Sequence, residues 1–196
     1  MAALDRAATF CYNITMFTIN NAISPEEGFI IERAISYLVR NYNESGYNSK
    51  PVILHSIRVA NLLMEMNYSK KVIVGALLHD IIEDTKITFE QLNKDFGEEI
   101  CALVSAVSYN KSISDPIAQY KDMYDRIISF GKEAVILKAV DIAVNSLYIH
   151  LVSDADKRKQ LIEKGTYFLN LTEKFSDELA WKLLKKRNLE EIKKLS

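Results

Sequence analysis

Helical periodicity runs through nearly all of this 196-residue chain and restricts its fold more than any other feature. Apolar residues recur at spacings of three and four, and no stretch alternates apolar and polar residues as a half-buried strand would. The pattern therefore predicts an all-α protein. Because the length suits one domain with a substantial core, we expect residues 1–196 to form a single helical bundle.

Capping and turn residues predict where the helices begin and end. Ser24, Pro25 and Glu27 have the spacing of a capping box with proline at the first helical position, and this helix is predicted to reach about residue 42. Pro51 opens the next helix, with His55 in its first turn. Further helices are predicted at about residues 69–82, 88–96, 98–108, 116–130, 132–151, 156–175 and 177–195.

Composition limits the possible classes of function. A formal net charge of −1 favours neither nucleic acid nor an anionic membrane as a partner. Cys11 and Cys101 are too few for a disulfide framework, and the N-terminus lacks the pattern of a secretory signal. The longest apolar runs are shorter than the roughly 18 residues of a membrane span. We therefore expect a cytoplasmic protein that binds neither nucleic acid nor membrane, with its oligomeric state left open.

A charged cluster ends the most apolar of the predicted helices, in the segment VIVGALLHDIIEDT, residues 72–85. On a continuous helix, side chains three or four residues apart lie next to one another. This spacing relates His79, Asp80, Glu83 and Asp84, so we expect their side chains to form a cluster. Three carboxylates at a helix C-terminus oppose the helix dipole unless a cation or loop donors compensate. A solvated helix end is the alternative, but the apolar run before His79 favours partial burial, where an unpaired charge is costly.

Two other segments supply residues that would complement this cluster. His55 lies 24 residues before His79, and histidine is the commonest metal ligand, although a histidine at a helix start can simply bond to backbone or solvent. In LKAVDIAVN, residues 137–145, Lys138, Asp141 and Asn145 form one polar stripe, which a solvated helix face would also explain. A mixed set of imidazoles and carboxylates suits Mn²⁺, Fe²⁺ or Zn²⁺, and the candidate ligands are His55, His79, Asp80 and Asp141.

This order of a histidine, a His-Asp pair and a distant aspartate is similar to the HD superfamily of metal-dependent phosphohydrolases. The segments ALLHDIIEDT, TFEQLNKDFGEEICALVSAVS and LKAVDIAVN resemble the hydrolase domain of RelA/SpoT-type enzymes. The same segments also resemble the small single-domain relatives of those enzymes, which include the metazoan-type (p)ppGpp hydrolases. It covers about residues 30–175 and implies an all-helical HD domain.

The resemblance also implies a site and a reaction. It implies one Mn²⁺, or another divalent metal, held by His55, His79, Asp80 and Asp141. Glu83 and Asp84 would orient or deprotonate the attacking water, while the metal polarises a phosphoryl oxygen and lowers the pKa of the water. The implied reaction removes pyrophosphate from the 3′ position of ppGpp, a small-molecule nucleotide, and leaves GDP. The expected substrate contacts are Asn145, Lys138, Tyr167, Lys50 and Lys111.

The chain departs from the family pattern where the substrate would be recognised. The family's basic residue nine positions before the first histidine is Gly46 here, and the family's Arg and His near the distant aspartate are Ile142 and Val144. Because a pyrophosphate needs several cations or donors, two alternatives stay open. One is a phosphohydrolase for a different phosphorylated nucleotide, and the other is a non-catalytic nucleotide-binding module. The acid pair at residues 83 and 84 favours an enzyme, because a binding module has little need of it.

Overall fold

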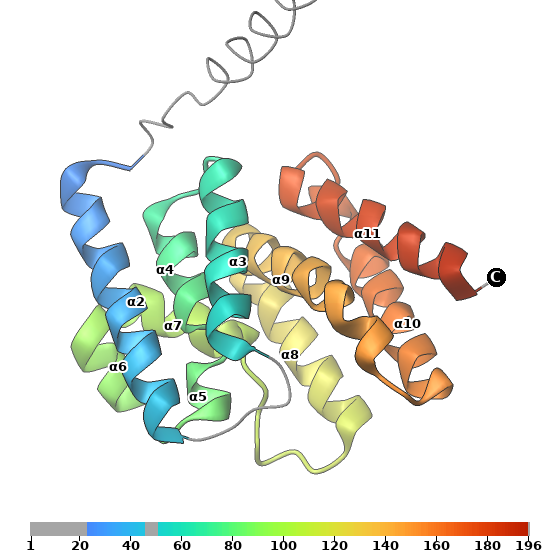
Figure 1. The fold of residues 1–196 in the computed structure, drawn as a ribbon, viewed down its shortest axis with the longest axis horizontal. Coiled ribbons are helices and arrows are strands. Elements are labelled where there is room, and N and C mark those ends of the chain that lie inside the picture. Colours follow the sequence, from blue (N-terminus) through green and yellow to red (C-terminus); the bar gives the residue numbers. More distant parts are fainter. Residues whose placement is uncertain (1–22, 46–50, 196) are drawn as a thin grey trace, which may run out of the picture.

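The computed structural model describes residues 23–45 and 51–195, and every regular element within these ranges is helical, which confirms the all-α prediction (Figure 1). The α-helices are α2 (Pro25–Ser45), α3 (Val52–Glu65), α4 (Lys70–Leu78), α5 (Ile81–Asp84), α6 (Phe89–Phe96), α7 (Glu98–Val107), α8 (Pro116–Phe130), α9 (Lys132–Asn145), α10 (Ala155–Leu171) and α11 (Leu179–Leu195). Two 3₁₀ helices, η1 (Ser146–Leu151) and η2 (Glu173–Phe175), follow α9 and α10.

Side-chain caps fix several of the helix starts that the sequence predicts. Ser24 Oγ accepts from the backbone N–H of Glu27 at 3.2 Å, and Glu27 Oε2 accepts from the N–H of Ser24 at 3.1 Å. Thr88 and Gln91 form the same reciprocal pair at α6, and the Asp115 side chain caps α8. These caps satisfy N–H groups that a helix start leaves free, so they determine where the helices begin.

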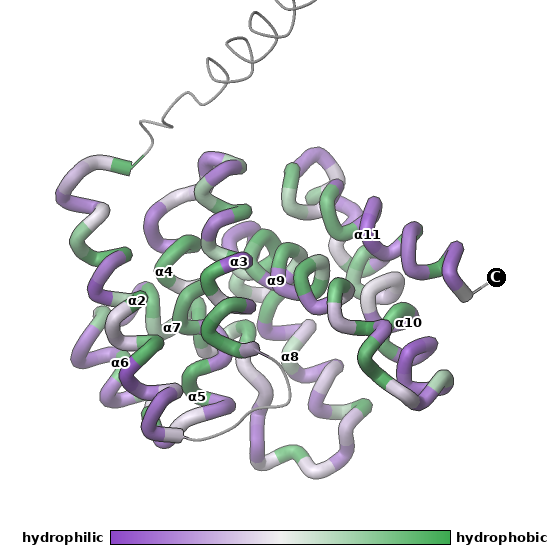
Figure 2. The backbone as a smooth tube through the Cα atoms, viewed as in Figure 1, coloured by the Kyte–Doolittle hydropathy of each residue, from purple (hydrophilic) through white to green (hydrophobic). Residues whose placement is uncertain are grey.

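Helices α4 and α9 form the centre of the bundle. Helix α4 packs against α2, α3, α7 and α9, and α9 packs against α3, α4, α7, α8 and α11 (Figure 1). Residues Val72–Leu78 of α4 are all buried, as are residues 134–141 of α9. Figure 2 shows the hydrophobic colour gathered on these inner helices. The central packing places the C-terminal end of α4 against α9, where the predicted metal ligands lie.

The segment Lys132–Leu151 has the length and composition of a membrane span, but 67% of its most apolar window is buried inside the protein. The sequence predicted one helix here, whereas the structure divides the segment between α9 and η1. Packing against five neighbouring helices explains the apolar character of α9 as that of a core helix.

The helix predicted at residues 69–82 is interrupted, and this is the main error in the predicted boundaries. Helix α4 ends at Leu78, His79 and Asp80 form a turn, and α5 follows. The N–H of Glu83 bonds to the carbonyl of Asp80 at 3.0 Å, whereas an uninterrupted helix would direct it to the carbonyl of His79. That carbonyl instead accepts from Ser108 Oγ at 3.3 Å. Because Ser108 follows α7, local periodicity could not reveal the interruption.

Candidate metal centre and active site

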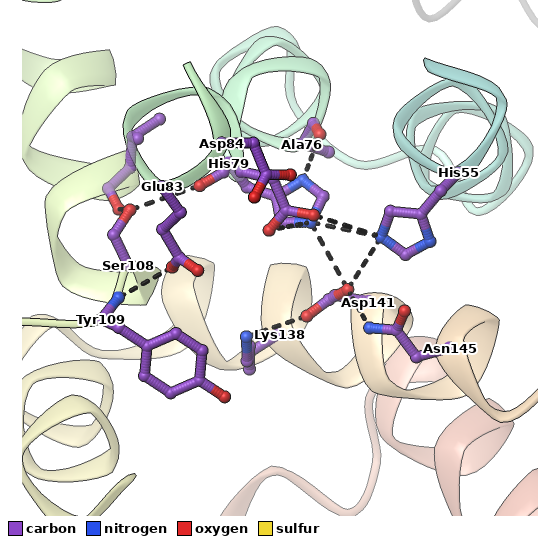
Figure 3. A network of polar contacts seen from close by, with 12 residues as sticks. His55, Ala76, His79, Glu83, Asp84, Ser108, Tyr109, Lys138, Asp141 and Asn145 are labelled. Atoms are coloured by element: carbon purple, nitrogen blue, oxygen red, sulfur yellow. Dashed lines mark hydrogen bonds and ion pairs between the residues drawn. The ribbon is translucent and has the colours of Figure 1, made fainter. Parts of the chain in front are cut away.

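Four side chains from three parts of the fold converge between α3, α4 and α9. Nε2 of His55, on α3, lies 3.3 Å from Nε2 of His79 and 3.0 Å from Oδ1 of Asp141, on α9 (Figure 3). His79 Nε2 lies 3.4 Å from Asp141 Oδ1 and 3.1 Å from Oδ1 of Asp80. The structure therefore brings together all four of the residues that the sequence marks as candidate metal ligands.

The donor atoms of this cluster fit one divalent cation. Ligand atoms about 2.1 Å from an ion lie about 3.0–3.4 Å from one another in octahedral or tetrahedral geometry. The separations among His55, His79 and Asp141 run from 3.0 to 3.4 Å. His79 Nδ1 lies 2.7 Å from the carbonyl of Ala76, and donation to that carbonyl turns the Nε2 lone pair toward the cluster. The HD-type arrangement and these distances indicate a divalent metal site.

The carboxylates of the cluster attract positive charge strongly. Burial by itself lowers the pKa of His79, but Asp80 and Asp141 outweigh burial and raise this pKa to about 10. Burial would raise the pKa of Asp141, yet Lys138 and His79 hold it well below its usual range. Lys138 Nζ lies 2.9 Å from Asp141 Oδ2, and Asn145 Nδ2 donates to Oδ1 at 2.7 Å. One oxygen of Asp141 thus faces Lys138, and the other faces the histidines.

The adjacent acids Glu83 and Asp84 are held by different partners. The backbone N–H of Tyr109 donates to Glu83 Oε1 at 2.8 Å (Figure 3). The hydroxyl of Tyr42 donates to Asp84 Oδ2 at 3.0 Å. Burial raises the pKa of Glu83, against the opposing attraction of Lys138. A carboxylate with a raised pKa is suited to accept a proton. The sequence did not predict the role of Tyr42, because it lies 42 residues from Asp84.

The side chain of Lys111, from the loop between α7 and α8, reaches the C-terminal end of α5. Its Nζ donates to the carbonyl oxygens of Ile82 and Glu83 at 3.0 and 2.9 Å. A cation at this position compensates the negative end of a helix. Lys111 and the Tyr109 N–H therefore supply the loop donors that an acidic helix end requires. The sequence predicted Lys111 as a substrate contact, and the structure places its ammonium group on the backbone of α5.

The other predicted substrate contacts lie in different places. Asn145 and Lys138 line a cavity of about 210 Å³ beside the cluster. Tyr167 is 50% exposed and stacks on Tyr124, with ring centroids 6.0 Å apart, in a neighbouring outer groove. Lys50 lies outside the described residues, as does Gly46. Of the predicted substrate contacts within the described residues, Asn145 and Lys138 thus lie beside the candidate metal ligands.

Tyrosines that were not predicted from the sequence as site residues form much of the cavity wall. Tyr109, Tyr120 and Tyr124 follow one another edge to face, with centroid distances of 5.2 and 6.1 Å. Lys164 Nζ lies 3.5 Å from the centroid of the Tyr120 ring and adds a second ammonium group to the wall. The spacing of residues 120 and 124 on one helix is a possible signal, but core aromatics show the same spacing.

The fold and the site together define an all-α protein with a cluster of two buried histidines, one buried aspartate and one partly buried aspartate, suited to one divalent metal. A family model described as an HD domain matches residues 34–127. Over these residues, close to half of its length, the chain is similar to HD domains.

Comparisons with known proteins agree on the kind of HD domain that this chain resembles. The chain is 28% identical over 142 residues to the guanosine-3′,5′-bis(diphosphate) 3′-pyrophosphohydrolase of Aquifex aeolicus, which is 71% of this chain and 20% of that protein. It is 34% identical over 125 residues to the probable enzyme of the same name from Mycoplasma pneumoniae, which is 63% of this chain and 16% of that protein. The chain spans about a fifth or less of the length of these relatives.

A solved structure has the same fold over most of the chain. It is described as a metazoan orthologue of SpoT that hydrolyses ppGpp. The TM-score is 0.69 at 20% sequence identity, and the match covers 85% of this chain and 96% of the other. At this level of identity the match establishes a shared fold.

Proposed function

We propose that this chain is a Mn²⁺-dependent phosphohydrolase that removes pyrophosphate from the 3′ position of (p)ppGpp. The observation that carries the proposal is the position of the acid pair Glu83 and Asp84 in α5, the short helix that follows the turn at His79 and Asp80. The names of the relatives support the choice of reaction. The retained acids favour hydrolysis over simple nucleotide binding.

We assign His55, His79, Asp80 and Asp141 as the metal ligands. When bound, the cation would polarise a phosphoryl oxygen and lower the pKa of a water. Asp141 contributes to this site as an ionised carboxylate, because Lys138 stabilises its charge. Asn145 donates to the oxygen of Asp141 that faces the histidines and thereby fixes its orientation.

We assign Glu83 as the acceptor of the proton from the attacking water, with Asp84 orienting that water. Burial of Glu83 raises its pKa, which makes its carboxylate a stronger base than that of an exposed glutamate. The Tyr109 N–H occupies one carboxylate oxygen of Glu83, and its other oxygen remains the proton acceptor in this assignment. The hydroxyl of Tyr42, on α2, donates a hydrogen bond to Asp84 and thereby orients its carboxylate.

The cavity beside the cluster is the proposed nucleotide site. Base stacking on aromatic side chains contributes about 1–3 kcal/mol per base, and the wall offers Tyr109, Tyr120 and Tyr124. Within the described part of the chain, Lys138 and Lys164 are the cationic residues that line this cavity. The charge of Lys138 is already paired with Asp141. This modest positive charge favours, as a second candidate, a nucleotide with fewer phosphates than ppGpp.

A product assay separates these candidates. The Mn²⁺-loaded protein is incubated with ppGpp, pppGpp and a panel of nucleoside mono-, di- and triphosphates, and phosphate is measured with and without added inorganic pyrophosphatase. Phosphate that appears from ppGpp only after pyrophosphatase addition supports the proposed reaction. Direct phosphate release from another nucleotide supports the second candidate. A folded, Mn²⁺-bound protein that turns over none of these compounds would contradict both.

Metal binding has a readout that is independent of activity. A ligand at 100 times its Kd stabilises the folded state by about 2.7 kcal/mol, which corresponds to an increase in Tm of about 5–10 °C for a chain of this size. We expect Mn²⁺ to produce this increase and Asp80→Asn to reduce it. Asp125→Asn, on the exposed surface of α8, is the matched control. Equal Mn²⁺-dependent shifts in the two variants would show that Asp80 is not a ligand.

A further inference from the structure

We propose that Arg126 is a positioning residue for Glu83 and acts through the peptide group between Ser108 and Tyr109. The inference rests on the proposed role of Glu83 as the proton acceptor. Arg126 lies on α8, and its effect on Glu83 requires no direct contact between the two side chains.

The guanidinium of Arg126 holds the C-terminal end of α7. Its Nη2 donates to the carbonyl of Ser108 at 2.7 Å, and its Nη1 donates to the carbonyls of Ser105 and of Ala106, the latter at 3.3 Å. The last carbonyl groups of a helix have no N–H partner within that helix. The planar guanidinium group of arginine offers several charged N–H donors that suit such carbonyls. Arg126 therefore fixes the direction in which the chain leaves α7.

The peptide group between Ser108 and Tyr109 forms hydrogen bonds through both its oxygen and its N–H. Its oxygen, on Ser108, accepts from Arg126. Its N–H, on Tyr109, donates to Glu83 Oε1 at 2.8 Å (Figure 3). A cation on the carbonyl oxygen polarises the peptide group and strengthens its N–H as a donor. One peptide group thus connects the charge of Arg126 to the carboxylate of Glu83 and sets the orientation of that carboxylate.

Further contacts hold both Arg126 and the segment around Ser108 in place. Arg126 Nε and Nη2 lie 2.9 and 2.8 Å from Oδ2 of Asp122, one turn earlier on α8, which holds the guanidinium in place. Ser108 Oγ bonds to the carbonyls of Val104 and of His79 at 2.8 and 3.3 Å. The segment that presents the Tyr109 N–H is therefore anchored to α7, to α8 and to the turn that carries the metal ligands.

Loss of Arg126 should misplace the base without removing a metal ligand or a wall of the cavity. A displacement of about 1 Å in a reacting group can cost on the order of 100-fold in rate. We therefore expect Arg126→Gln to lower kcat by about 10- to 100-fold and to leave KM within about twofold. Arg126→Lys retains a cation with a narrower reach, so it should restore part of the lost rate.

The experiment measures kcat and KM together with amide hydrogen exchange at Tyr109 by NMR. Arg126→Gln should speed exchange of the Tyr109 N–H, and Arg126→Lys should give an intermediate rate. Arg187→Gln is the control, because it removes an arginine whose partner is Glu190 on the outer surface of α11. If Arg126→Gln does not fold, Arg126→Lys alone carries the comparison.

Two results would overturn the inference. One is exchange at Tyr109 that matches the control, which would show that Arg126 does not hold this N–H. The other is faster exchange with unchanged kcat, which would show that the contact does not position the base. Failure of the proposed function looks different: the wild-type protein would then hydrolyse none of the nucleotides, while exchange at Tyr109 would still respond to Arg126→Gln.

Discussion

His79 serves the fold and the site at the same time. Its Nδ1 contacts the carbonyl of Ala76, its Nε2 faces the other candidate ligands, and its own carbonyl accepts from Ser108. The last contact interrupts the helical hydrogen bonds where α4 gives way to α5. The residue that ends the buried helix is therefore the same residue that presents an imidazole to the metal site.

Glu83→Gln is the substitution that tests the assignment of the base. A glutamine keeps an oxygen that can accept from the Tyr109 N–H, but it cannot take a proton from water. We expect kcat to fall by about 10²- to 10⁴-fold, the usual contribution of a general base, with bound Mn²⁺ unchanged. Steady-state kinetics and elemental analysis of the purified protein measure the two quantities.

Glu99→Gln, on the exposed face of α7, is the control for the loss of one carboxylate. Loss of the metal in Glu83→Gln would show that Glu83 is a ligand. Undiminished turnover would assign the base to another group.

At the scale of elements, the position of α4 depends on close packing at Gly75. A Cβ added there would lie 2.7 Å from Leu103 Cδ2 and 3.3 Å from Leu137 Cδ1, on α7 and α9. Both leucines are completely buried, so neither has open space to move into. The glycine therefore lets α4, the helix that leads to the candidate metal ligands, approach α7 and α9 closely.

We expect Gly75→Ala to destabilise the fold by about 1–3 kcal/mol, because overpacking outweighs the helix propensity that alanine gains. Gly28→Ala in α2 is the matched control: nothing lies within 4 Å of its added Cβ. That variant should be more stable by about 0.5–1 kcal/mol. Urea unfolding gives both values. A Gly75→Ala protein as stable as Gly28→Ala would show that the helices separate without cost.

At the scale of the whole molecule, tyrosines couple stability to alkaline pH. Burial is the main cause of a raised pKa at Tyr37, Tyr42, Tyr68, Tyr109 and Tyr124. A raised pKa means that the folded state favours the neutral phenol more than the unfolded state does. The resulting stability is fully present below pH about 10 and is lost as the pH rises through the folded-state values.

Tyr37 gives a specific test, because burial and a hydrogen bond with Asp95 raise its pKa to about 12. The free energy of unfolding of the wild-type protein should fall between pH 10 and pH 12. In Tyr37→Phe this group no longer ionises, so the fall should be less steep. Urea unfolding at a series of pH values measures both slopes, and identical slopes would exclude a contribution from Tyr37.

Features that depend on residues close together in the chain could be predicted from the sequence. Apolar spacing identified the helices, and caps such as Ser24 and Thr88 located their starts, because a cap bonds to backbone only two or three residues away. The candidate ligands were found from residue type, spacing and family resemblance. The structure then placed their donor atoms 3.0–3.4 Å apart in the case of His55, His79 and Asp141.

Contacts between distant segments could be found only from the packing of the helices. The turn at His79, the hold of Tyr42 on Asp84 and the link from Arg126 to Glu83 all join residues far apart in the chain. Periodicity carries no information about which loop faces which helix end, because that depends on how the helices pack. The sequence therefore predicted the helices and the candidate chemistry of their side chains, and packing determined which partner holds each acid.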